Sequence, residues 1–175
     1  MTPRPVEHPR LPRGADWAAL GDLALLDAPR LEPVILSRSL TPQALAERLA
    51  ALEAAVREGA VLVGGFISRG ETEAAKRLAR LPGLRLIRLL PYPIALCHPG
   101  PGALRRIEEG RTLILSGYAE GDGRLTRAAC VQVNRWTLAL CGRQPDTPAP
   151  APSEPAPALR EPPPAADDDP GAIFL

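Results

Sequence analysis

Residues 61–77 read VLVGGFISRGETEAAKR: an apolar run, a glycine turn and a segment of helix-forming residues, in that order. The apolar run at 61–63 is short and bounded by turn residues, which is typical of a buried strand. Glycines such as Gly64 and Gly65 allow backbone angles and close approaches that other residues avoid. A strand, glycine turn and helix in this order direct backbone N–H groups and a helix N-terminus towards one point, where an anion can bind. The stretch therefore predicts a strand–turn–helix unit. It fits either a phosphate-bearing ligand or an ordinary turn without a ligand.

The flanking sequence repeats this alternation of strand and helix. Further strands are expected at residues 33–36, 84–90 and 112–115, and helices at 16–26, 42–58, 70–81, 103–109 and 126–141. Thr41 is a suitable N-cap, with Pro42 at the first helical position. Strands that alternate with helices predict an α/β fold with parallel βαβ units and an open sheet flanked by helices.

Composition divides the chain into three parts. Ten of the 31 residues from 145 to 175 are proline, and that segment carries a net charge of −5, against +4 for residues 16–143. We expect an extended arm at 1–15, a folded domain at 16–143 and a disordered Pro/Ala-rich linker at 144–175. The linker ends in an acidic and apolar tip, which fits either a solvated tail or a peptide that docks on a protein partner. The tip residues are Asp167, Asp168, Asp169, Ile173, Phe174 and Leu175.

Several classes of protein are disfavoured by the sequence. The three cysteines show no CxxC spacing, which argues against a disulfide framework and for a reducing, cytoplasmic setting. His98 beside Cys97 is not spaced to hold a metal ion with a second pair. No apolar run approaches the ~18 residues that span a membrane. We expect no metal, no cofactor and no membrane segment.

In an open α/β sheet, ligands bind beyond the carboxyl ends of the parallel strands. The residues expected there are small, hydroxylic or basic, which suits phosphate binding better than acid–base chemistry. They are Ser37, Arg38, Gly64, Gly65, Ser68, Arg69, Gly70, Ser116 and Gly117. Arg38 and Arg69 are the preferred anion ligands, because a guanidinium group binds phosphate in bidentate fashion. The alternative is that both are surface arginines paired with nearby carboxylates.

Read in order, several segments resemble the DprA/Smf family of DNA-processing proteins. They are LGDLALL (20–26), VILSR (34–38), VGGFISRG (63–70), LLPYP (89–93), ALRRIEEGRTLILSGYAEG (103–121) and RAACVQVNRWTLALC (127–141). The likeness covers residues 16–143 and implies a Rossmann-like domain of the wider DprA/LOG-type superfamily. Leu36 and Gly117 stand where the family has a glycine and a glutamate.

The resemblance also implies a function and a set of site residues. DprA proteins bind single-stranded DNA and load a recombinase, without known enzymatic turnover. The positions that border the family's nucleic-acid pocket are matched here by Ser37, Arg38, Gly65, Arg69, Gly70, Asn134 and Arg135. We therefore expect a non-enzymatic module that binds single-stranded DNA or a nucleotide, with a role in DNA processing or uptake.

Two other functions stay open. One is a LOG-type nucleotide phosphoribohydrolase, although its PGGxGT loop has no match here. The other is an adaptor that recruits a partner through the C-terminal tip. A sheet edge left unpaired after the last helix would also invite formation of a homodimer.

Overall fold

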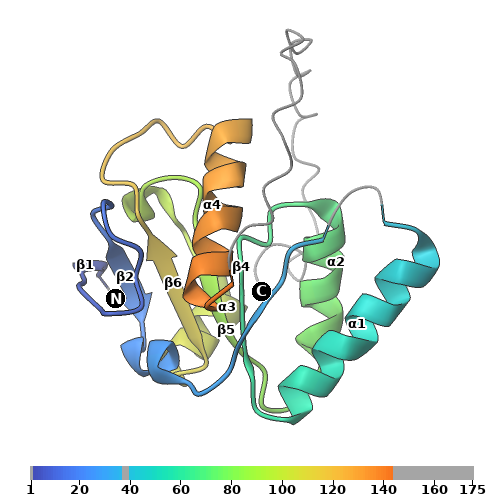
Figure 1. The fold of residues 1–175 in the computed structure, drawn as a ribbon. Coiled ribbons are helices and arrows are strands. Elements are labelled where there is room, and N and C mark those ends of the chain that lie inside the picture. Colours follow the sequence, from blue (N-terminus) through green and yellow to red (C-terminus); the bar gives the residue numbers. More distant parts are fainter. Residues whose placement is uncertain (1, 37–39, 144–175) are drawn as a thin grey trace, which may run out of the picture.

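The computed structural model describes residues 2–36 and 40–143, and a six-stranded sheet lies at the centre of this part of the chain (Figure 1). The strand order is β1-β2-β6-β5-β4-β3. The strands are β1 (Arg4–Pro5), β2 (Ala18–Gly21), β3 (Leu31–Pro33), β4 (Val61–Gly64), β5 (Arg85–Leu89) and β6 (Thr112–Ser116). β3 to β6 are parallel, whereas β1 and β2 are antiparallel additions at one edge. The predicted α/β class with a mostly parallel sheet is confirmed.

Helices cover both faces of the sheet. One face carries α1 (Pro42–Arg57), α2 (Arg69–Leu78), α3 (Pro101–Glu108) and the short 3-10 helix η2 (Ile94–Leu96); the other carries α4 (Arg127–Leu140) and the 3-10 helix η1 (Leu23–Asp27). The strands alternate accordingly. Val61 and Val63 pack in the cluster under α4, whereas Leu62 between them packs against α1 and α2. The three layers bury the apolar strands on both faces, as parallel sheets require.

Side chains cap the N-termini of α1, α2 and α4, whereas α3 begins at Gly100 without a side-chain cap. Thr41 caps α1 by accepting a hydrogen bond from the N–H of Ala44 at 3.2 Å, and Pro42 is the first helical residue, as predicted. Thr126 caps α4 in the same way through the N–H of Ala129, at 3.1 Å. These caps satisfy N–H groups that have no partner inside the helix.

The helix expected at residues 16–26 is wrong. The chain there forms β2, which pairs antiparallel with β6 so that Ala18 lies opposite Ser116 and Gly21 opposite Leu113, and then η1. Ala19 packs in the cluster under α4, whereas Leu20 packs on the opposite face of the sheet. This alternation is the period of a strand, so pairing with β6 overrides the local helix propensity.

The N-terminal segment lies against the body of the protein. β1 pairs with β2, and the N–H of Val6 donates to the carbonyl of Trp17 at 2.9 Å. Val6 and Leu11 are buried in the cluster under α4. None of the helices in the described residues has the length and apolar character needed to cross a bilayer.

β3 forms the other edge of the sheet, and an ionic cluster lies beside it. The carboxylate of Glu32, a residue only 7% exposed, accepts hydrogen bonds from Arg48 of α1 at 3.1 Å and from Arg143, just after α4, at 3.2 Å. Arg48 also donates to the carbonyl oxygen of Pro33 at 2.7 Å. The cluster ties the edge strand to α1 and to the segment that follows α4.

Candidate functional site at the carboxyl edge of the sheet

The structure brings several predicted site residues together where β4 ends. Gly65 follows β4, Ser68 caps α2, and Arg69 and Gly70 are the first residues of that helix. α4 passes close by, because a Cβ atom added at Gly65 would lie 2.8 Å from Cγ1 of Val133. Asn134 and Arg135 follow Val133 in α4; Val133 is buried against the sheet, whereas Arg135, two residues further along the helix, is exposed on its outer side.

Other predicted site residues lie apart from this group or outside the described residues. Ser116 and Gly117 end β6, two strands away from β4, so they belong to the same edge of the sheet. Ser37 and Arg38 lie outside the described residues, as do the tip residues 167–169 and 173–175. Leu36, which precedes Ser37, is hydrogen-bonded to Glu71 of α2. Leu36, the last described residue of this segment, therefore lies beside the N-terminus of α2.

The glycines of this edge are accounted for by packing. A Cβ at Gly64 would lie 2.7 Å from the carbonyl oxygen of Val34, and one at Gly65 would lie 2.8 Å from both Val133 and Ile67. A Cβ at Gly117 would lie 2.8 Å from the ring of Trp136, which explains why a glutamate does not fit there. Gly70 differs, since its nearest neighbour would be Leu36 at 3.7 Å, an ordinary contact.

Sequence reasoning missed Glu71, which organises the glycine turn. Its Oε2 accepts hydrogen bonds from the N–H groups of Ile67 at 2.9 Å and Ser68 at 3.2 Å, and its Oε1 accepts one from Leu36 at 3.2 Å. Ser68 returns the contact, because its hydroxyl accepts from the N–H of Glu71 at 3.2 Å. This is a capping box, and the spacing Ser-x-x-Glu at 68–71 is its recognised sequence signature.

The turn itself holds an unusual backbone. Phe66 has a φ of +53°, a left-handed conformation that bulky residues rarely adopt. The hydroxyl of Thr72 donates to the carbonyl oxygen of Ser68 at 3.0 Å and lies 3.4 Å from the carbonyl oxygen of Phe66. Side chains of α2 therefore hold the turn from within the protein.

The hydroxyl of Ser116 is also used inside the protein. Ser116 is fully buried; its hydroxyl donates to the carbonyl of Tyr92 at 2.8 Å and accepts from the N–H of Tyr118 at 3.1 Å. These bonds join the loops that follow β5 and β6. Ser116 thus shapes the edge of the sheet instead of offering a free hydroxyl.

Two exposed arginines lie on the helices α2 and α4 that border this edge. Arg69 begins α2 and Arg135 lies on α4, and neither has a carboxylate within 4.0 Å among the described residues. Arg77 of α2 differs, because its guanidinium group contacts Glu53 at 2.6 Å. The guanidinium groups of Arg69 and Arg135 are therefore available to an anionic ligand.

Tyr118 and the thiols of Cys97 and Cys141 are partly buried. Tyr118 packs edge-on against Trp136 with ring centroids 5.2 Å apart, and burial, reinforced by Cys130, raises the pKa of its hydroxyl. Burial also raises the pKa of the Cys97 thiol, and that of Cys141 to about 12. Both thiols are protonated at neutral pH. Among the described residues, no group of three or more His, Cys, Asp or Glu side chains is placed to hold a metal ion.

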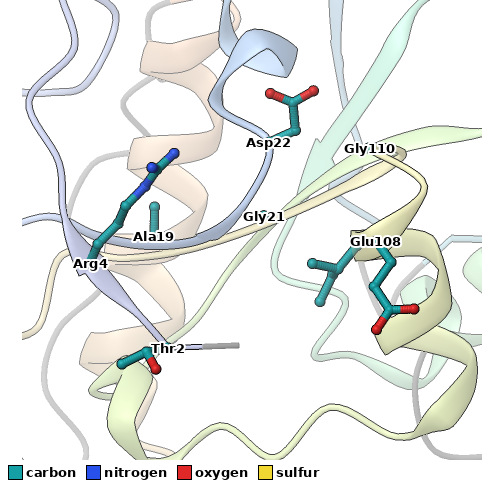
Figure 2. A pocket seen from close by; sticks show the side chains of 8 residues that line it. Thr2, Arg4, Ala19, Gly21, Asp22, Glu108 and Gly110 are labelled. Carbon is teal, nitrogen blue, oxygen red and sulfur yellow. The ribbon is translucent and has the colours of Figure 1, made fainter.

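A pocket of about 470 Å³ lies elsewhere, between β2 and the end of α3 (Figure 2). Arg4 and Asp22 line one side of it and Glu108 the other. Gly21, which also lines it, pairs with Leu113 near the start of β6, whereas Ser116 is at the end of that strand. The pocket is therefore at the amino edge of the parallel strands and is separate from the candidate site.

The sequence matches no protein-family model and no curated protein. Its structure is similar to that of DNA processing protein A (DprA) from Helicobacter pylori, reported for its single-stranded DNA binding mode. The identity is 25%, the TM-score 0.58, and the match covers 79% of this chain and 66% of that one. DprA from Streptococcus pneumoniae shares the fold at 20% identity and a TM-score of 0.52, over 80% of this chain and 51% of that one.

This chain therefore spans about two thirds of the Helicobacter protein and half of the Streptococcus protein. Both similarities extend over most of the part that the structure describes. They agree with the resemblance that the ordered motifs predicted from residues 16–143. The chain is thus DprA-like: its fold is similar to that of the DprA DNA-processing proteins.

Proposed function

We propose that this chain binds single-stranded DNA at the carboxyl edge of its sheet, without enzymatic turnover. The observation that carries the proposal is the structural similarity to Helicobacter DprA, which was reported for its binding of single-stranded DNA. A role in DNA processing or uptake follows from the same similarity and is part of the proposal. So is the division into an arm at 1–15, a binding domain at 16–143 and a linker at 144–175.

The charges at the edge support this function. Arg69 and Arg135 are exposed and have no carboxylate partner among the described residues. Contacts between such cations and phosphates release counterions, which supplies most of the sequence-independent affinity for nucleic acids. Glu71 of α2 is buried and its carboxylate accepts hydrogen bonds from backbone N–H groups, so it forms no ion pair with these arginines.

The proposed site divides its residues by role. Arg69, Arg135 and, on sequence grounds, Arg38 bind phosphate groups. Asn134 and Ser37, which precede Arg135 and Arg38 in sequence, are proposed as further polar ligands. Gly70 lies next to Arg69 at the start of α2. The remaining predicted residues shape the edge, because packing or internal hydrogen bonds occupy them: Gly64, Gly65, Ser68, Ser116 and Gly117.

Fluorescence anisotropy with a labelled oligo-dT strand tests the proposal over a series of salt concentrations. The wild-type protein should bind at low salt, with affinity falling linearly on a log–log plot. Arg69→Ala and Arg135→Ala should each weaken binding on the order of tenfold and lower the salt slope by about 0.7, the value for one phosphate contact on a single strand.

Arg80→Ala is the matched control. Arg80 is exposed, follows the far end of α2, and has no carboxylate within 4.0 Å among the described residues. Its replacement removes the same charge at the opposite end of the same helix. Equal losses in Arg80→Ala and Arg69→Ala would show only a general charge effect, and undetectable binding at low salt would refute the proposal.

A further inference from the structure

The turn between β4 and α2 already contains an anion. The carboxylate of Glu71 accepts three backbone N–H groups, from Ile67, Ser68 and Leu36, at 2.9–3.2 Å. The residue is only 5% exposed. A charged acceptor on several backbone donors makes hydrogen bonds about twice as strong as neutral ones.

Ile67 and Ser68 supply two of the turn's N–H donors, and a bound phosphate could otherwise use them. In a strand–turn–helix unit, a phosphate group is held by the N–H groups of the turn and by the positive end of the helix dipole. Here the N–H groups of Ile67 and Ser68 point at Glu71, and the N–H of Glu71 itself donates to Ser68. The carboxylate lies in the first turn of α2, where its negative charge also interacts favourably with the positive end of the helix dipole.

We propose that Glu71 closes the glycine turn to terminal phosphate groups and thereby determines which class of ligand this edge accepts. A phosphate monoester, as in a mononucleotide, needs several donors at one point and would meet the negative charge of Glu71 there. A phosphodiester chain can instead bind through separated arginine side chains such as Arg69 and Arg135. The selection of a polymer rests on the proposed function; the closing of the turn does not.

The test compares variants of the full chain by thermal shift, with inorganic phosphate and AMP as probes and sodium chloride of equal ionic strength as reference. The wild type should gain no stability from either probe. Glu71→Ala frees three backbone donors, so phosphate should raise its Tm in a saturable manner. A purely structural role of Glu71 would lower the Tm of this variant without creating phosphate dependence.

Two further variants complete the design. Glu73→Ala removes an exposed carboxylate two residues away, which contacts Lys76 at 3.5 Å, and should behave as the wild type. Glu71→Gln keeps the size of the side chain but loses its charge and one acceptor, so its Tm should depend on phosphate less strongly than that of Glu71→Ala. This variant also serves as the test if Glu71→Ala does not fold.

Two results would overturn this inference: a wild-type protein stabilised by phosphate and AMP as strongly as the Glu71 variants, or variants that both gain nothing. Oligo-dT binding is measured on the same samples. Its absence in the wild type refutes the proposed function alone, since the phosphate comparison does not depend on it.

Discussion

At the scale of single residues, the glycine turn illustrates how one sequence pattern can serve two purposes. Gly64 and Gly65 stand where a ligand could approach the backbone, yet the space beside them is filled by Val34, Ile67 and Val133. The close approach of α4 to the end of β4 therefore requires glycine whether or not a ligand binds.

Gly65→Ala and Gly70→Ala form a matched pair that tests this account. Alanine at 65 places a methyl group 2.8 Å from Val133 and Ile67, so we expect a loss of roughly 1–3 kcal/mol in the free energy of unfolding. Alanine at 70 meets only Leu36 at 3.7 Å inside a helix, so we expect a gain of up to about 1 kcal/mol. Urea unfolding measures both. Equal losses at the two positions would show that packing against α4 does not explain Gly65.

At the scale of secondary-structure elements, α2 depends on its capping box. Ser68→Ala removes the acceptor for the N–H of Glu71, and the expected cost is about 1 kcal/mol, measured by urea unfolding. Ser68→Thr keeps a hydroxyl at this position and should retain most of the stability. Because the hydroxyl acts inside the protein, oligo-dT affinity should change little in either variant. A large loss of affinity with unchanged stability would instead make Ser68 a direct ligand.

The elements also show what can be predicted from sequence here. The strands near 61–63, 84–90 and 112–115 were predictable because each is a short apolar run with turn residues at its ends, and α1 because Thr41 and Pro42 mark its start. β2 could not be predicted from its local sequence, because its pairing with β6 joins residues about 95 apart in the chain and outweighs local propensity.

The candidate site was predictable only in part. Parallel strands place their carboxyl ends together, so the location of Arg69 and Ser116 at one edge followed from the order of elements. The internal hydrogen bonds of Ser116 and the clash of a side chain at Gly117 with Trp136 depend on tertiary packing and leave no local pattern. The capping box of Glu71 has a local sequence pattern, the Ser-x-x-Glu spacing. Its contact with Leu36, 35 residues earlier in the chain, has no such pattern.

At the scale of the whole molecule, the cluster around Glu32 connects parts of the chain that are far apart in sequence. Arg48→Ala should lower the free energy of unfolding by about 2 kcal/mol, because the buried carboxylate and the carbonyl of Pro33 both lose a charged donor. Arg57→Ala, on the same helix, breaks only a contact of 3.5 Å with Glu53 and should change stability by less than about 0.5 kcal/mol. Chemical unfolding of both variants checks the difference. Similar small effects would mean that the cluster contributes no more than a surface ion pair.

The ionic cluster beside the edge strand β3 also affects how the molecule behaves at high concentration. An open strand edge recruits further strands, which is a common origin of aggregation and fibril growth. Pro33 has no N–H to offer, its carbonyl is occupied by Arg48, and the charged side chain of Glu32 lies beside it. A second chain would have to displace Arg48 before it could add a strand at this position. These contacts argue against a homodimer built on β3.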